Sequence, residues 1–270
     1  MSFGKTGIKF IVPLIGIEQG RKLAAMSLRI RSEELELVAA ALRSMSKYGV
    51  RTLGFSCSAN GDEYVCVGLG DYTNASKTPS EVASELSRMP GVTNVEVHEG
   101  PVTGFAAVRG LVLEAAEARA ILMSARALAG LLQGPREYLG DDAGAAFVYY
   151  EGFFTGRAMG EYLSQFGRED ALAMFPRILE ARGYGTPIEV LRDPNDGHYR
   201  FEVGRLVECE ILSRYASGRR TSHFFRGIIA GVLSTIEGGN WNVEEVECIN
   251  AGSDKCAFEA RRGGAGQPSK

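Results

Sequence analysis

Hydrophobic and polar positions follow alternating strand and helix periods through the first hundred residues of this 270-residue chain. Residues 23–31 (LAAMSLRIR) predict a β-strand, and the polar residues after it predict a helix that Ser32 caps and that runs to about Tyr48. Two strands with alternating hydrophobic positions follow. They are joined by Asn60-Gly61, a dipeptide typical of tight β-hairpins.

A second helix and a fourth strand complete this pattern. Thr78-Pro79-Ser80-Glu81 is typical of a helix start, and residues 92–100 (VTNVEVHEG) predict a strand. The order is therefore βαββαβ, which is the ferredoxin-like arrangement. We assign residues 1–100 to this first domain and residues 101–110 to a linker.

Residues 111–262 predict a second domain, in which helices pack on an antiparallel sheet, so the whole chain is of the α+β class. Glycines at 152, 156 and 160 lie four residues apart and favour close contact between two helices. Residues 263–270 predict a disordered tail. Helices are expected at 111–132, 144–167, 168–185 and 221–239, and strands at 186–193, 198–209, 242–250 and 255–261.

The composition narrows the class of protein. Hydrophobic residues make up 45% and charged residues 23%, which is typical of a globular protein, and the net charge is −3. The chain lacks the positive charge that nucleic-acid binding requires, and we expect no direct nucleic-acid partner. No segment is long and apolar enough for a membrane helix or has the pattern of a signal peptide. We therefore expect a cytoplasmic protein with no membrane partner.

Cys248 and Cys256 lie near the end of the chain, with Gly252 midway between them. A hairpin that turns at Gly252 would place the two thiols opposite each other, which suits either a metal ion or a disulfide. Glu245 lies three residues before Cys248, so it reaches the same face only if the strand starts late or bulges. Two thiols with neither a metal nor a cross-link are the third alternative.

The other three cysteines are predicted to be small buried residues. With a two-residue turn at Asn60-Gly61, Cys57 would face Tyr64 and lie diagonally from Cys66. Cys209 is expected on the strand 198–209.

The first domain resembles an ACT domain in its element order and in the segment PGVTNVEV, residues 90–97. The resemblance implies a regulatory module that pairs with a second copy. It also implies that small effectors bind near the loop after the first strand, here Arg29–Glu33.

The second half of the chain resembles the 4-vinyl reductase domain, a family regarded as hydrocarbon-binding. Three motifs carry this resemblance: YYEGFFTGRAMG, SHFFRGIIAG, and the spacing Glu245-x2-Cys248-x3-Gly252-x3-Cys256-x-Phe258. It implies a dimer with an apolar pocket. In the sensor branch of the family it also implies zinc ligands at Glu245, Cys248 and Cys256.

The first zinc ligand of that branch, a cysteine, falls on Ser222 in this chain. Because serine is not a normal zinc ligand, we expect His223 to be the fourth ligand if zinc is bound. The departure at Ser222 favours buried or oxidised cysteines without a metal over zinc.

The expected function is that of a non-catalytic regulatory protein, with no catalytic residue assigned. It would bind a small apolar or aromatic ligand and signal through a homodimer or a downstream regulatory protein. The alternatives are a vinyl-group reductase or its accessory subunit, and a structural adaptor in a complex. The residues expected to line the ligand pocket are Tyr199, Phe201, Phe224 and Ile228.

Overall fold

The computed structural model describes residues 12–31, 36–115, 118–193, 197–215 and 218–263. The chain divides into two compact units, one within Ile8–Ile121 and the other within Leu122–Lys270. Among the described residues, no helix combines the length and the apolar character needed to cross a membrane.

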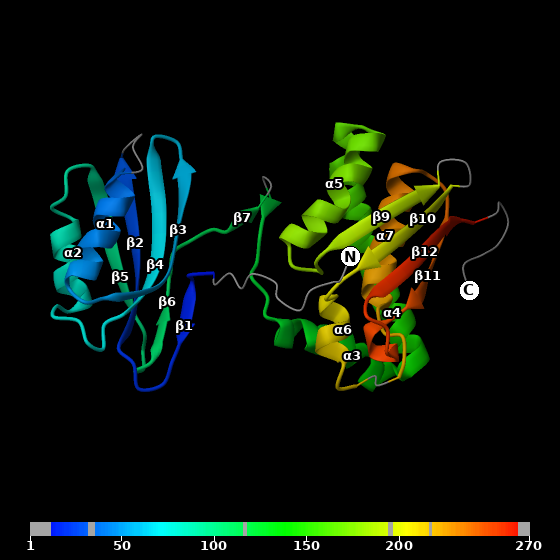
Figure 1. Cartoon of the computed structure of the whole chain (residues 1–270), viewed down its shortest axis with the longest axis horizontal. Coiled ribbons are helices and arrows are strands. Elements are labelled where there is room, and N and C mark those ends of the chain that lie inside the picture. The colour runs from blue at the N-terminus through cyan, green and yellow to red at the C-terminus, as the bar shows by residue number, and fades with distance from the viewer. Residues whose placement is uncertain (1–11, 32–35, 116–117, 194–196, 216–217, 264–270) are drawn as a thin grey trace. The chain divides into compact units, whose positions relative to one another are not determined.

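The N-terminal unit contains a four-stranded antiparallel sheet in the order β3-β4-β2-β5. Helices α1 and α2 lie on one face of this sheet and cover a core of buried apolar side chains (Figure 1). The predicted ferredoxin-like order is confirmed. The elements are β2 (Leu23–Arg31), α1 (Glu36–Lys47), β3 (Arg51–Asn60), β4 (Glu63–Asp71), α2 (Pro79–Leu86) and β5 (Val92–Glu99).

The motif that predicted the start of α2 forms a capping box. The Thr78 hydroxyl accepts a hydrogen bond from the Glu81 backbone N–H, and the Glu81 carboxylate accepts one from the Thr78 backbone N–H at 2.7 Å. The predicted cap of the first helix, Ser32, and part of the expected effector loop lie outside the described residues.

A second, two-stranded sheet uses part of the predicted linker. Strand β1 (Ile15–Ile17) pairs antiparallel with β6 (Phe105–Ala107). Ala106 is fully buried and packs with Leu23, Ala25 and Leu69, which the main sheet supplies. Residues 105–107 are therefore part of the fold of this unit.

The prediction that Cys57 and Cys66 are unlinked core residues is wrong. They form a disulfide with an S–S distance of 2.04 Å. The hairpin turns at Gly61 and Asp62, because Asn60 pairs with Glu63, and this register places Cys57 directly opposite Cys66. Gly61 has a φ of +62°, the left-handed conformation that glycine adopts without strain, and this sets the turn one residue later than expected.

The C-terminal unit packs helices on a four-stranded antiparallel sheet in the order β11-β12-β10-β9 (Figure 1). Two short 3₁₀ turns, at Ser164–Phe166 and Ile249–Ala251, complete it. The longer elements are α3 (Ala125–Leu139), α4 (Asp141–Leu163), α5 (Arg168–Ala181), β9 (Ile188–Asp193), β10 (His198–Val203), α6 (Val207–Leu212), α7 (His223–Ile236), β11 (Trp241–Glu247) and β12 (Cys256–Arg262).

Two predicted elements of the second half are wrong. The helix expected at 111–132 begins only at Ala125, where Ser124 caps α3, and short strands β7 (Glu114–Ala115) and β8 (Ala118–Arg119) precede it. Leu111, Val112 and Ile121 are exposed, so the apolar residues that suggested a helix face there pack against nothing within the described chain. Cys209, expected on a strand, lies on the short helix α6.

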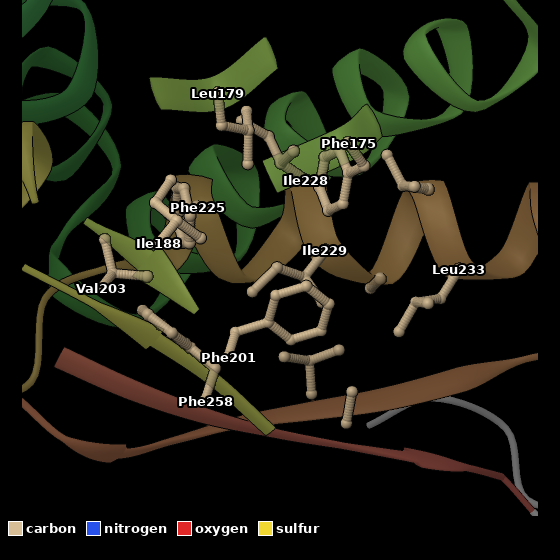
Figure 2. Close-up of a cluster of buried hydrophobic side chains, with 14 of the residues drawn as sticks. Phe175, Leu179, Ile188, Phe201, Val203, Phe225, Ile228, Ile229, Leu233 and Phe258 are labelled. Atoms are coloured by element: carbon tan, nitrogen blue, oxygen red, sulfur yellow. The ribbon is translucent and has the colours of Figure 1, made fainter. Parts of the chain in front are cut away.

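Helix α7 is the centre of the C-terminal unit. A Cβ atom on Gly227 would lie 2.1 Å from the Tyr149 carbonyl oxygen, and one on Gly152 would lie 2.0 Å from that of Phe224. The backbones of α4 and α7 therefore touch, as the four-residue glycine spacing predicted. On its other side α7 faces the sheet: Figure 2 shows Ile229 and Leu233 on the same side of the helix as Phe201.

Candidate metal site

Four side chains converge at one end of α7. Cys209 comes from α6, Glu245 from β11, Cys248 from the segment after β11, and Cys256 from the start of β12. All four are buried, and their sulfur and carboxylate oxygen atoms lie within 4.8 Å of one another. Segments up to 47 residues apart in the sequence are thus brought to one point.

The hairpin between β11 and β12 places three of these residues. Its register shifts between Glu245, which pairs with Phe258, and Glu247, which pairs with Ala257. This is the bulge that Glu245 needs in order to reach the face of the cysteines. A 3₁₀ turn and Gly252, with a φ of +97°, then return the chain to Cys256.

The thiol distances suit a tetrahedral metal ion. The Cys209 sulfur lies 3.6 Å from that of Cys248 and 3.3 Å from that of Cys256. In a tetrahedral site with Zn–S bonds of about 2.3 Å, two sulfurs are separated by about 3.8 Å. The three sulfurs and one carboxylate form a donor set that zinc accepts after a small expansion of the cluster.

Ser222 occupies the position where the resemblance placed the first ligand. Its backbone N–H and its hydroxyl donate to the two oxygens of Glu245, at 3.1 and 2.8 Å. Its hydroxyl oxygen also lies 3.0 Å from the Cys209 sulfur. Ser222 therefore orients Glu245 and touches the cluster, as the outer partners of metal ligands do, and Cys209 supplies a thiol in its stead.

His223 is not among the four clustered residues. It is the first residue of α7, where burial, and then the charges of Arg226 and Arg136, lower its pKa to about 4. The structure thus puts Cys209 where His223 was expected. The sequence held one signal for this residue, because Cys209 is the remaining cysteine once Cys57 pairs with Cys66 and Cys248 with Cys256.

Burial and mutual hydrogen bonds shift the protonation of the cluster. Burial raises the pKa of Glu245 to about 8. Hydrogen bonds with Cys209 and Cys256 lower the pKa of Cys248, whereas the bond to Cys248 raises the pKa of Cys209 to about 12. One thiolate is therefore stabilised by two thiol donors, an arrangement that a cation would replace by binding all the sulfurs as thiolates.

Glu208, the neighbour of Cys209, fixes the start of α7. Its carboxylate is buried and accepts the backbone N–H groups of Phe224 at 3.0 Å and Phe225 at 2.8 Å. These N–H groups have no carbonyl partner within the helix. The pKa of Glu208 is raised to about 7 by burial, against the effect of these two donors.

The four residues predicted to line a ligand pocket lie in the core of the C-terminal unit. Tyr199, Phe201 and Ile228 are buried among other apolar side chains, and Phe224 is partly buried against them. The Tyr199 hydroxyl donates to Glu237. A cavity of about 520 Å³ lies instead in the N-terminal unit, between the start of α2 and residues 99–105.

The family model of the 4-vinyl reductase domain, which the motifs resemble, matches residues 203–262. This range contains all four residues of the cluster. The predicted resemblance is confirmed for these residues. No curated protein matches this sequence significantly.

Three solved structures are similar to parts of the chain. The phenol-responsive sensory domain of the transcription activator PoxR, solved with phenol, is 21% identical over 54% of this chain and 78% of its own, with a TM-score of 0.48. A vinyl-4-reductase family protein from Methanocaldococcus jannaschii is 18% identical over 50% of this chain and 91% of its own, with a TM-score of 0.30. The ACT domain of GTP pyrophosphokinase from Chlorobium tepidum is 14% identical over 28% of this chain and 97% of its own, with a TM-score of 0.25.

Replacing Glu208 tests the link between α6 and α7. Glu208→Ala leaves two buried N–H groups without an acceptor, and we expect the free energy of unfolding to fall by about 2–4 kcal/mol. Glu208→Gln keeps one carbonyl oxygen and should lose less. Urea denaturation followed by circular dichroism measures both.

The matched control is Glu210→Ala on the same short helix. Glu210 is 46% exposed and forms an ion pair with Arg205, so its loss should change the stability by less than about 0.5 kcal/mol. Equal effects at the two positions would show that Glu208 does not anchor α7.

Proposed function

We propose that the chain is a non-catalytic regulatory protein whose C-terminal unit holds a structural zinc ion and binds a small apolar or aromatic ligand. The convergence of Cys209, Glu245, Cys248 and Cys256 carries the zinc part of this proposal. When bound, zinc would cross-link α6 to the β11–β12 hairpin and neutralise the buried thiolates and carboxylate.

The character of the site favours a structural role over a catalytic one. All four donors come from the protein, and the four residues are between 0% and 6% exposed. Catalytic zinc sites keep one position open for water or substrate, whereas structural sites are closed by four protein ligands. This supports the proposal that the chain does not act as an enzyme.

The match to the 4-vinyl reductase domain and the aromatic lining of the core support a ligand of apolar or aromatic character. Tyr199, Phe201 and Ile228 already fill the core, so a ligand would enter where the cover is incomplete. Tyr184 and Phe224, which are partly buried against the core, mark that edge. A ligand that bound one arrangement of these side chains better than the other would shift the balance between them, and this would be its signal.

We further propose that a second copy of the chain covers the outer face of α4. Phe147, Tyr150, Phe154 and Tyr162 recur at three- or four-residue steps, or a multiple of them, and are 37–59% exposed. At ~200 Å² for each aromatic side chain they expose roughly 400 Å². This is about half of the ~800 Å² that each partner buries in a standard interface, so they would form its apolar centre.

The expected metal content is one zinc ion per chain. Cys209→Ala should lower it to a small fraction, since it removes one of four ligands, whereas His223→Ala should leave it unchanged. Zinc is measured by mass spectrometry on protein purified without a chelator. A His223→Ala variant that loses zinc, beside a Cys209→Ala variant that keeps it, would contradict the assignment of the fourth ligand.

Ligand binding should raise the melting temperature of the whole chain. A compound present at 100 times its dissociation constant adds about 2.7 kcal/mol to the free energy of unfolding. The measurement is a thermal shift with a panel of phenols, alkylbenzenes and fatty alcohols. If no compound shifts the melting temperature of the zinc-loaded protein, the ligand-binding function is contradicted, although the zinc site is not.

The homodimer is tested by light scattering of the purified chain. Phe154→Glu puts a charge into the centre of the proposed contact and should convert a dimer to a monomer. Tyr215→Glu, which alters an exposed aromatic residue outside α4, is the control and should stay dimeric. A wild-type chain that is monomeric at micromolar concentration would contradict this part of the proposal.

A further inference from the structure

Two arginines of the C-terminal unit lack a carboxylate partner. Arg136 on α3 and Arg226 on α7 are both half-buried, and neither forms an ion pair with any residue that the structure describes. The Nε atom of each is buried and has no hydrogen-bond partner among those residues. This contrasts with Arg200 of the same unit, which contacts the carboxylates of Glu202, Glu247 and Glu259.

The two guanidinium groups lie in one place. Both act on the charge of Glu208 and both lower the pKa of His223, so they flank the start of α7 together. Arg136 donates only a long hydrogen bond, of 3.4 Å, to the Thr221 carbonyl. Arg226 lies over the ring of Tyr149, with its guanidinium carbon 5.0 Å from the ring centroid.

The carboxylate that both arginines sense is already engaged. The two oxygens of Glu208 accept the backbone N–H groups of Phe224 and Phe225. His223 is held neutral in this environment, because burial and the two arginines lower its pKa to about 4. The cluster therefore has two positive charges and at most one negative charge, and that negative charge is used by the helix.

A buried guanidinium N–H without an acceptor is costly. Leaving a buried donor unsatisfied costs about 1–3 kcal/mol, and more for a charged group. In native structures such groups usually mark the place of a bound ion or an ordered water. Two of them side by side, on charged forks suited to planar oxyanions, favour an anion.

We propose that Arg136, Arg226 and His223 form a binding site for an anionic group, a carboxylate or a phosphate. The Nε–H and a terminal N–H of each arginine would donate to its oxygens, and His223 would donate from its neutral ring. Because the arginines come from α3 and α7, a bound anion would tie these two helices together. No ligand of the proposed metal site takes part, so this inference stands or falls independently of zinc.

The test is a titration of the whole chain with inorganic phosphate and, separately, with acetate, at constant ionic strength set by chloride. Isothermal calorimetry measures the affinity. Either anion is expected to bind, and the stronger of the two identifies the group that the site prefers. Arg136→Gln and Arg226→Gln should each weaken this binding about tenfold or more, because each removes hydrogen bonds between two charged groups.

Arg177→Gln is the matched control, since Arg177 is an exposed arginine on α5 that already pairs with Glu180. It should bind the anion as the wild-type chain does. Arg226→Lys keeps the charge but loses the planar fork, and it should bind more weakly than the wild type. Equal weakening in the Arg177 control would show general charge screening and would overturn the site.

A second measurement needs no variant to fold. In the wild-type chain, labelled with ¹⁵N at arginine, two Nε–H signals should shift when phosphate or acetate is added. If no signal shifts and no heat of binding is seen with either anion, water alone satisfies these arginines and the proposal is overturned.

Discussion

The burial of α7 between α4 and the four-stranded sheet determines the rest of the C-terminal unit. Residues Phe225 to Leu233 are buried almost without interruption, and glycines on both helices let the backbones of α4 and α7 touch. A helix held so tightly has a fixed N-terminus. Ser222 and the first N–H groups of α7 therefore reach Glu245 and Glu208 in defined geometry, and both candidate sites are built around this end of the helix.

The position of Cys209 follows from the same constraint. Glu208 accepts the N–H groups at the start of α7, so the short helix α6 is drawn against this point, and its next residue is brought to the two cysteines of the hairpin. The bulge in β11 turns Glu245 toward the same place. Packing, helix capping and strand geometry thus each contribute to the four-residue cluster.

Much of this fold could be predicted from periodicity, but the fourth member of the cluster could not. The alternation of residues 23–31 and the capping box at Thr78 identified the ferredoxin-like unit, and the hairpin spacing identified Glu245, Cys248 and Cys256. Cys209 was missed because a six-residue helix carries too little periodicity to be told from a strand. Cys57 and Cys66 were misassigned because a turn shifted by one residue changes every cross-strand pair.

The most direct test of the account is X-ray absorption at the zinc edge of the zinc-loaded chain. The account predicts three sulfur atoms at about 2.3 Å and one oxygen at about 2.0–2.2 Å from the ion, and no scattering from an imidazole ring. Cys209→Ser should reduce the sulfur count to two. A spectrum with two sulfurs and an imidazole in the wild-type chain would place His223 at the metal and contradict the assignment of Cys209.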